Sequence, residues 1–543
     1  MKKKLFTIAF ILLYVLNLTG QNTSKNAYWI KLKDKSGTPN QIDQPEKFLS
    51  QRAIERRIRQ HIAIDETDLP VSSIYLDSLR KMGLEIVHTS KWLNGVTVRT
   101  ADAVLIQEIA DLSFVSAVQL TKHATTLKSA FNKFNETEDP SSYGNAWAQL
   151  SQLNGQYLHN QGFRGKGIQI AVLDGGFYHV DRLAAFDILR NSGRILGVRD
   201  FVNPTSNFYE QNTHGMSVLS CMGGNIPGSL VGTAPDASYY LIRTEDVNSE
   251  NLIEEDNWVA GAELADSLGV DVINSSLGYT QFDDPLMNHV YADMDGKTTH
   301  VTQGANMAFQ KGILVFTSAG NEGANAWMRI VAPSDGKDVI SVGAVGSDGI
   351  RAYFSSLGPG FGGAVKPNVA ARGYSTYLLT SSGVLGTSSG TSFSSPVLAG
   401  MGACLIQANP YAGVKLVKEA IEQSASQFAT PDSLLGYGIP DFKKADQFLK
   451  TNSIEMLSQR KEWTVFPNPF KQSITIRNAD SGSTDHFRIG LYNIQGVCLK
   501  ESNISSSGKL VLDNLANFPE GLYLLKIDSG KKSETIKLVK SGN

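Results

Sequence analysis

Three regions of the chain differ in the spacing of their hydrophobic positions, and the first spans residues 28–121. Its pattern predicts a small α+β module with elements in the order β, α, α, β, β, α, β. The expected strands are 28–32, 84–87, 96–99 and 114–120, and the expected helices are 48–61, 73–82 and 104–112. A polar stretch from Lys122 to Ser142, rich in Asn, Thr, Ser, Glu and Pro, then indicates a linker.

In the second region, from Gly167 onward, short apolar β-branched runs alternate with helical patterns. This alternation is typical of a doubly wound parallel sheet with helices on both faces, so we predict an α/β fold. The expected strands are 168–173, 239–242, 270–274, 313–317 and 339–342, with helices at 253–268 and 301–310. Functional residues of such sheets gather beyond the carboxyl ends of the strands.

The third region follows a second polar stretch near 451–461 and alternates in period two. The alternating segments are 473–477, 488–492, 510–513 and 522–527. Short alternating strands of this kind predict a C-terminal β-sandwich.

The N-terminus has the pattern of a signal peptide, because Lys2, Lys3 and Lys4 precede an apolar run over 5–18. That run is shorter than the roughly 20 apolar residues that span a membrane. The expected division is therefore a signal peptide at 1–21, an N-terminal module at 22–125, a linker at 126–150, a central domain at 151–450, a linker at 451–462 and a C-terminal module at 463–543.

Composition adds two constraints. A formal net charge of −2 gives no electrostatic reason to expect nucleic acid as a partner. The cysteines are an odd three, Cys221, Cys404 and Cys498, at unrelated spacings, which argues against a disulfide framework or a metal cage. Cys221 and Cys404 lie in apolar helical stretches, where we expect them to pack as small hydrophobic side chains.

Two candidate catalytic residues lie where the fold class predicts. Asp174 ends the strand 168–173 and precedes two glycines, although a lone Asp in this position is often only a turn residue. His214 follows Thr213, which can cap a helix, and precedes Gly215, whose missing side chain allows close approach by a strand or a substrate. Taken alone, His214 is more simply interpreted as a surface histidine at a helix start.

A nucleophile and an oxyanion donor complete the set of candidates. Ser392 lies ahead of an apolar helix over 397–408, with Pro396 near the start of that helix. The amides of a helix N-terminus favour negative charge, as an attacking serine and its tetrahedral intermediate require. Asn321 follows the strand 313–317, and its amide can donate to an oxyanion, although a turn is the simpler interpretation of any Asn between glycines.

Together these segments resemble the subtilisin-like serine peptidases, the subtilase family, and they occur in that family's order. The resemblance covers about 157–442 and rests on five motifs. They are AVLDGG around Asp174, THGMSV around His214, NSSLG at 274–278, SAGNEG around Asn321 and GTSFSSP around Ser392. Met216 and the Gly-Gly-Phe after Asp174 depart from the commonest family pattern without touching a catalytic atom.

The resemblance implies roles for particular residues. Ser392 matches the nucleophile, His214 the general base, Asp174 the carboxylate that orients the imidazole, and Asn321 the side-chain oxyanion donor. It further implies substrate-binding residues on two walls of the P1 pocket and at its floor. These are Ser276, Leu277 and Gly278 on one wall, Ser318, Ala319 and Gly320 on the other, and Val331 at the floor, where many relatives have Gly.

The regions on either side of the central domain also resemble known domains. Residues 28–121 resemble the inhibitory propeptide of these enzymes, and the tail resembles the C-terminal sorting domain of the type IX secretion system. The expected partners are therefore polypeptide substrates, the chain's own propeptide and the type IX secretion machinery, and the expected location is the cell surface or the medium. No cofactor is expected to be required. Loop Asp and Asn residues can ligate calcium, but no compact oxygen-ligand loop stands out, so metal binding stays open.

Three other interpretations of the sequence are weaker. Ser388 lies in a G-T-S-S-G segment that fits the elbow of α/β-hydrolases, but those enzymes need a histidine downstream, and the only later one is His486 in the tail. Gly162, Gly165 and Gly167 precede a strand instead of following it, which argues against a dinucleotide site. A catalytically inactive surface-binding relative is the remaining alternative, and the competent residue types at all three triad positions argue against it.

Overall fold

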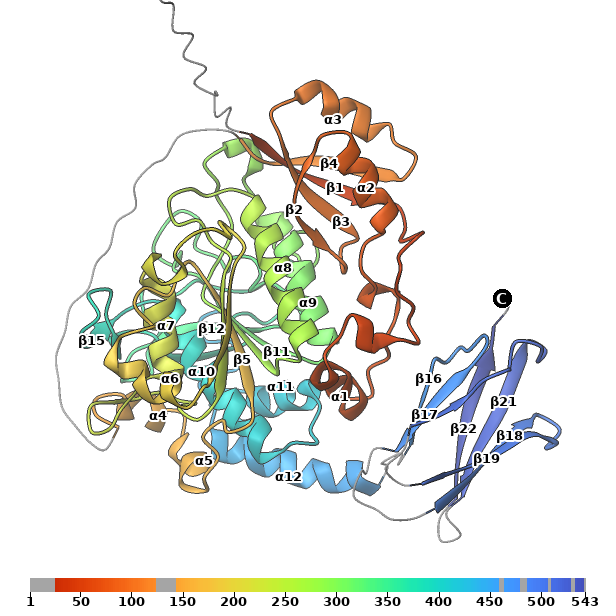
Figure 1. Cartoon of the computed structure of the whole chain (residues 1–543). Helices are drawn as coiled ribbons and strands as arrows, with labels where there is room; N and C mark the ends of the chain where they lie inside the picture. The colour runs from red at the N-terminus through yellow and green to blue at the C-terminus, as the bar shows by residue number, and fades with distance from the viewer. Residues whose placement is uncertain are drawn as a thin grey trace, which may run out of the picture.

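The computed structural model describes residues 25–123, 143–458, 463–478, 486–505, 509–528 and 533–541. These residues form an N-terminal module, a central domain and a C-terminal module (Figure 1). The predicted signal peptide and most of the predicted linker at 126–150 lie outside the described residues.

The N-terminal module is an antiparallel sheet in the order β2-β3-β1-β4 with helices packed on it. The apolar positions that predicted the elements form a core of their own, in which Ile30, Val96 and Val98 are fully buried. The predicted order is confirmed. The elements are β1 (Asn26–Leu32), α1 (Gln51–Arg59), α2 (Ser73–Lys81), β2 (Glu85–Ser90), β3 (Gly95–Thr100), α3 (Ala103–Ala110) and β4 (Val115–Lys122).

The central domain is built on a seven-stranded parallel sheet in the order β13-β12-β11-β10-β5-β9-β6. The strands are β5 (Gln169–Asp174), β6 (Ile195–Asp200), β9 (Ser238–Arg243), β10 (Val272–Ser275), β11 (Leu314–Ser318), β12 (Ile340–Val345) and β13 (Val369–Arg372). All five predicted strands are confirmed. The sequence pattern misses β6, because this edge strand exposes Leu196 and Val198, and it misses the four-residue β13.

Helices cover both faces of this sheet, as the alternating pattern predicts. Figure 1 shows α8 (Ile253–Leu268) and α9 (His300–Gln310) on the face toward the N-terminal module, and α7 (His214–Gly223) and α10 (Thr391–Ala408) on the other face. The sequence places the start of the last helix at Val397, whereas α10 begins six residues earlier and contains Pro396. Similarly, α12 (Phe442–Ser458) runs through the predicted start of the second linker, because Phe442, Ala445 and Leu449 anchor it in the core.

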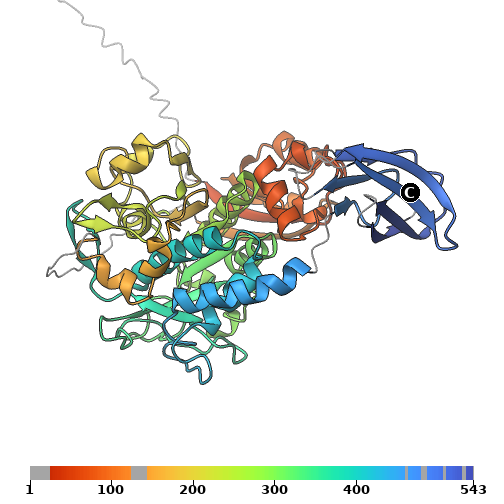
Figure 2. The ribbon, with the colours of Figure 1, turned by 90° about the horizontal axis from the view of Figure 1, so that it is seen from below.

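The C-terminal module is a β-sandwich with its own core, which includes Trp463, Phe470, Leu525 and Leu538. One sheet contains β16 (Trp463–Phe466), β17 (Ile474–Asn478) and β20 (Lys509–Leu512), and the other contains β18 (His486–Asn493), β19 (Cys498–Ser505), β21 (Gly521–Asp528) and β22 (Ser533–Lys540). In Figure 2 the module projects to one side, beyond the end of α12. Within the described part of the chain, no helix is long and apolar enough to cross a membrane.

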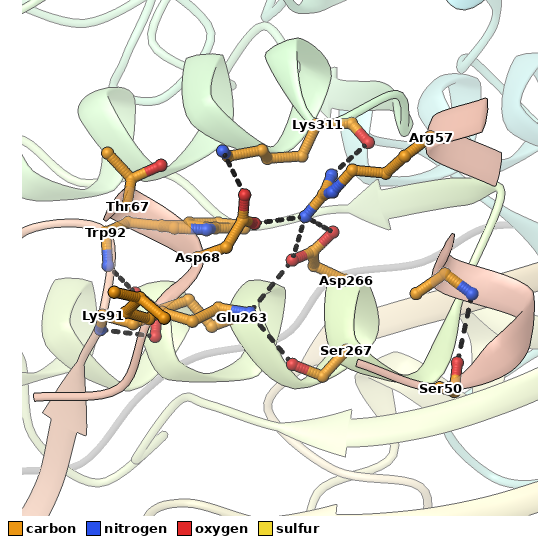
Figure 3. Close-up of polar contacts among 12 residues, drawn as sticks. Ser50, Arg57, Thr67, Asp68, Lys91, Trp92, Glu263, Asp266, Ser267 and Lys311 are labelled. Carbon is orange, nitrogen blue, oxygen red and sulfur yellow. Dashed lines mark hydrogen bonds and ion pairs between the residues drawn. The ribbon is translucent and has the colours of Figure 1, made fainter. Parts of the chain in front are cut away.

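A buried ion network joins the N-terminal module to the central domain (Figure 3). Arg56 and Arg57 extend from α1 to Asp266 of α8, and all three side chains are almost fully buried. Lys91 Nζ lies 3.0 Å from Asp266 Oδ2. Burial would raise the pKa of Asp266, but the charges of Lys91, Arg57 and Arg56 outweigh it and hold that pKa well below its usual range. Asp68 of the module in turn pairs with Arg57 and with Lys311, which precedes β11.

A second contact lies at the connection between β2 and β3. Glu263 of α8 accepts hydrogen bonds from Ser90 Oγ at 2.6 Å, from the Lys91 amide at 2.9 Å and from the Trp92 amide at 3.0 Å. Figure 3 shows Glu263 with Lys91 and Trp92 beside the ion network, and Glu263 and Asp266 lie on the same helix. The N-terminal module is therefore held to α8 by buried ion pairs to Asp266 and by hydrogen bonds to Glu263, in addition to apolar packing.

Candidate active site

The carboxyl end of β5 meets the first turn of α7, and this brings Asp174 to His214. His214 Nδ1 donates to Asp174 Oδ1 across 2.8 Å, and the same oxygen accepts from the Gly175 amide at 2.7 Å. A Cβ atom at Gly215 would lie 2.8 Å from Asp174 Cβ and 2.5 Å from the Gly176 carbonyl oxygen. Only glycine at position 215 therefore allows the helix to approach the strand this closely, as the sequence predicts.

The surroundings of His214 favour its charged form. Burial alone would lower the pKa of this imidazole, but the charge of Asp174 and its hydrogen bond raise the pKa above its ordinary value. One side of the ring stays open, since 34% of the side chain is exposed. The predicted cap by Thr213 is wrong: its side chain makes no capping hydrogen bond, and Asn212 Oδ1 accepts from the His214 amide at 2.8 Å instead.

Ser392 lies in the first turn of α10, and Pro396 determines which group binds the carbonyl of Ser392. Pro396 has no amide hydrogen, so the carbonyl of Ser392, four residues earlier, lacks its helical partner. Ser276 Oγ donates to that carbonyl at 2.8 Å. The Ser392 hydroxyl donates to the Ser276 carbonyl at 3.4 Å, so its hydrogen bond to His214 is not formed in this conformation.

Asn321 follows β11 and is oriented by the start of α10. Its Oδ1 accepts from both the amide and the hydroxyl of Thr391 at 2.9 Å. With the oxygen fixed in this way, the Nδ2 group must point elsewhere. It lies 3.7 Å from the ideal Cβ position at Gly390, which precedes the helix. The donor is thus directed to the same helix start as Ser392.

The two predicted walls of the P1 pocket face each other, and the side chain of Val331 lies between them. An ideal Cβ at Gly278 would lie 2.3 Å from Val331 Cγ2, and one at Gly320 would lie 2.9 Å from Val331 Cγ1. Ser318 Oγ also donates to the Leu277 carbonyl at 3.5 Å. Val331 is 3% exposed, so its two methyl groups occupy the space between the walls. Ala319 is fully buried within the second wall.

A cavity of about 330 Å³ lies beside Asp174 and His214. Ser276, Leu277 and Gly278 line it, as does Phe393 from the motif around Ser392. The lining also includes three residues that the sequence patterns do not indicate: Glu245, Val247 and Glu250. Glu245 follows β9 by two residues, so a search beyond the carboxyl end of each strand would have found it. Glu250 lies farther along the same loop, where the sequence offers no signal.

The residues of the rival interpretations lie elsewhere. Ser388 is 2% exposed in β15 (Leu385–Ser388), where it is unavailable as a nucleophile. Cys221 and Cys404 are buried free thiols that pack in the core, which confirms the prediction for them. Cys498 is a free thiol on the surface.

Comparisons with known proteins match all three parts of the chain. Residues 165–438 match the model of the subtilase family, residues 27–138 match the Peptidase S8 propeptide domain of Bacteroidota, and residues 464–541 match the secretion system C-terminal sorting domain. A sorting domain of this kind marks a protein for secretion or for the cell surface.

Individual relatives agree with the match to the subtilase family. Subtilisin NAT of Bacillus subtilis subsp. natto is 30% identical over 281 residues, which cover 51% of this chain and 65% of the relative. A thermostable alkaline protease of Halalkalibacterium halodurans is 28% identical over 55% of this chain and 73% of its own length. The chain thus spans somewhat less than two thirds of the first subtilisins that it matches. Among solved structures, the prenylagaramide maturation protease PagA aligns with a TM-score of 0.43 at 20% identity, over 54% of this chain and 98% of that protein.

Proposed function

The chain belongs to the subtilase family, and on that premise we propose that it is a secreted serine endopeptidase that uses Asp174, His214 and Ser392. The observation that carries this proposal is the 2.8 Å hydrogen bond between His214 and the buried Asp174, beside a serine at a helix N-terminus. A carboxylate in this position fixes the tautomer of the imidazole and leaves Nε2 free to act as the base.

In the proposed reaction, the Ser392 hydroxyl turns from the Ser276 carbonyl to His214 Nε2, since such hydrogen bonds often form only with substrate present. The oxygen attacks the scissile carbonyl carbon as the imidazole takes the proton. The Asn321 Nδ2 group and the Ser392 amide then stabilise the oxyanion. His214 returns the proton to the leaving amine as the C–N bond breaks, and a water molecule, activated by the same imidazole, hydrolyses the ester on Ser392. Each proton transfer uses side chains of this chain, so we propose no cofactor.

Replacement of the nucleophile and of the oxyanion donor should have different costs. We expect Ser392→Ala to lower kcat by about 10⁶, because nucleophile and base act as a unit. Asn321→Ala should lower kcat by about 10²–10³, since the Ser392 amide still donates. Both magnitudes are those typical of this family. Steady-state hydrolysis of a chromogenic peptide measures them, with circular dichroism as the check on folding, and equal losses in two folded variants would contradict the assigned roles.

We further propose that Val331 restricts the P1 pocket to small or medium apolar side chains. Its methyl groups fill the space that the two glycines at positions 278 and 320 leave open. A misfit group in such a pocket costs about 1–3 kcal/mol.

Val331→Gly should therefore open the pocket. We expect the ratio of kcat/KM for Phe over Ala at P1 to rise about 10–200-fold. The matched control is Val384→Gly, on a residue that is 55% exposed, and it should leave the ratio unchanged. A peptide library varied at P1 gives the measurement. Wild-type enzyme that already preferred Phe and Tyr would refute the proposal.

The N-terminal module is proposed to be an intramolecular inhibitor. It matches a propeptide model, and its last described residues contact the loops that follow β9 and β10. Lys122 Nζ is 3.2 Å from Ser249 Oγ, and His123 Nε2 is 2.9 Å from Asp284 Oδ2. The buried network around Asp266 keeps the module in this place.

Loss of one arginine from that network should weaken the contact of the N-terminal module with α8 and shorten the period of inhibition. Arg57→Ala leaves Asp68 and Asp266 with fewer partners in a buried site, at a cost of about 3–5 kcal/mol. We expect a shorter lag before activity in purified precursor, and faster hydrogen exchange in the module when Ser392 is also replaced by Ala. Arg80→Ala, which breaks an exposed pair with Asp77, is the control and should keep the wild-type lag. An unchanged lag in the Arg57 variant would count against the inhibitory role of this contact.

The C-terminal module is proposed to bind the type IX secretion machinery and to take no part in the chemistry. Its core is separate from that of the central domain, and every proposed catalytic residue precedes it.

Deletion of 463–543 should therefore separate activity from location. We expect the truncated enzyme to keep its peptidase activity and to stay in the periplasm of its host. Leu525→Asp, in the buried core of the module, should trap the full chain in the same way, whereas Leu499→Asp, on its surface, should not. Cell fractionation with an activity assay and a blot tests this. Active truncated enzyme in the medium at normal levels would disprove the sorting role.

A further inference from the structure

The helix α1 belongs to a part of the N-terminal module that is distinct from its sheet. We call residues 45–60, which contain this helix, the α1 segment. Its apolar side chains form a cluster of their own, in which Leu49, Ala53 and Ile54 are buried. The core of the sheet consists of other residues, among them Ile30 and Val96. The α1 segment therefore has its own hydrophobic packing, separate from that of the sheet.

The α1 segment lies at the amino ends of three neighbouring strands of the central sheet, β5, β10 and β11. Arg52 donates to the carbonyls of Gly167, which precedes β5, and of Gly269, which precedes β10. Gln60 Nε2 donates to the carbonyl of Gly312, which precedes β11, at 2.8 Å. The carboxyl ends of the same three strands lead to the proposed catalytic groups and the substrate wall. One set of strands thus connects the α1 segment to the candidate active site.

The length of these strands separates the two sites. β5 has six residues and β10 has four, which corresponds to about 13–20 Å at roughly 3.3 Å per residue. The lining of the cavity beside His214 accordingly includes no residue of the α1 segment. The proposed inhibition comes from the other end of the module, where Lys122 and His123 contact the loops that follow β9 and β10. Clearing the cavity of an inhibitor therefore leaves the contacts of α1 in place.

Two arginines of the α1 segment hold it to the central domain through buried contacts (Figure 3). Arg56 Nη2 and Arg57 Nη2 lie 2.5 Å and 3.0 Å from the carboxylate oxygens of Asp266. The same guanidinium groups donate to backbone carbonyls, Arg56 to Val270 and Arg57 to Lys311. The three charged side chains are at most 1% exposed. Since a buried ion pair is costly to break, the segment should stay bound when its links to the sheet are cut.

Exposed loops link the α1 segment to the rest of the module on both sides. Residues 33–44 precede it and include the exposed Gly37 and Gln41. Residues 61–66 follow it and include the exposed Ala63 and Glu66. Exposed loops are preferred sites of proteolysis, so cuts there would separate the helix from the sheet.

We propose that the amino end of the central sheet is a docking site for the arginine-bearing α1 segment, and that this segment stays bound to the processed enzyme after the inhibitory sheet is removed. There it supports the strands that position Asp174, Ser276 and Asn321, without entering the substrate groove. The inference rests on the proposed peptidase function and on the proposed inhibition, and it adds that one part of the N-terminal module is not an inhibitor.

Mass spectrometry of the processed enzyme tests this inference. Active wild-type enzyme is passed through gel filtration and denatured, and we expect one peptide that contains residues 50–60 per catalytic chain, without the strands of the N-terminal sheet. Arg56→Ala should raise the dissociation constant of this peptide by about 10²–10³, so that it is lost on the column. Arg59→Ala is the matched control on the same helix. The Arg59 side chain is 37% exposed and lies 3.4 Å from Asp271, so this variant should keep the peptide.

The wild-type measurement decides the outcome even if Arg56→Ala does not fold. Active enzyme that lacks the peptide would refute the docking role and leave the peptidase function standing. Active enzyme that keeps the whole module would also refute it, because α1 would then not be separable from the sheet. If the wild-type chain has no activity, the proposed function fails, and the docking site is tested in Ser392→Ala precursor digested with an added endopeptidase. Retention of residues 50–60 after loss of the sheet would support the site, and their loss together with the sheet would disprove it.

Discussion

The site depends on the close approach of the carboxyl end of β5 to the start of α7. Glycine at positions 176 and 215 removes the atoms that would separate the two elements, and Asp174 can then reach His214 while staying fully buried. A larger residue at 215 would meet Asp174 itself. The orientation and the pKa of the imidazole thus follow from backbone packing, because the carboxylate that sets both has no freedom to move.

The carbonyl of Ser392 lacks its helical hydrogen bond, and a residue of the cavity beside His214 binds it instead. Pro396 cannot donate to the Ser392 carbonyl, and Ser276 supplies the donor from the neighbouring strand end. The first turn of α10 is therefore tied to Ser276, which lines the cavity beside His214, and through Thr391 to Asn321 as well. The groups that would attack the substrate, hold it and stabilise its oxyanion are fixed by one short segment of chain.

Charge is distributed unequally around this scaffold. Where the N-terminal module lies on α8, each buried carboxylate has a cation or several donors, as Asp266 and Glu263 show. In the cavity beside His214, by contrast, Glu245 accepts from a neutral donor, the Tyr279 hydroxyl. An interface that buries charged groups in this way compensates their charges, because unpaired buried charge is costly.

The sequence by itself determined the three-part organisation, the parallel sheet and the identity of Asp174, His214, Ser392 and Asn321 as candidates. These depend on local patterns: buried strands, the residues just after their carboxyl ends, and the start of an apolar helix. The tertiary structure alone decided that Asn212 instead of Thr213 caps α7, that Val331 fills the space between two glycines, and that Glu245 and Glu250 meet beside His214. Each of these is a contact between side chains distant in the chain or held by an irregular loop, and no periodic pattern encodes such contacts.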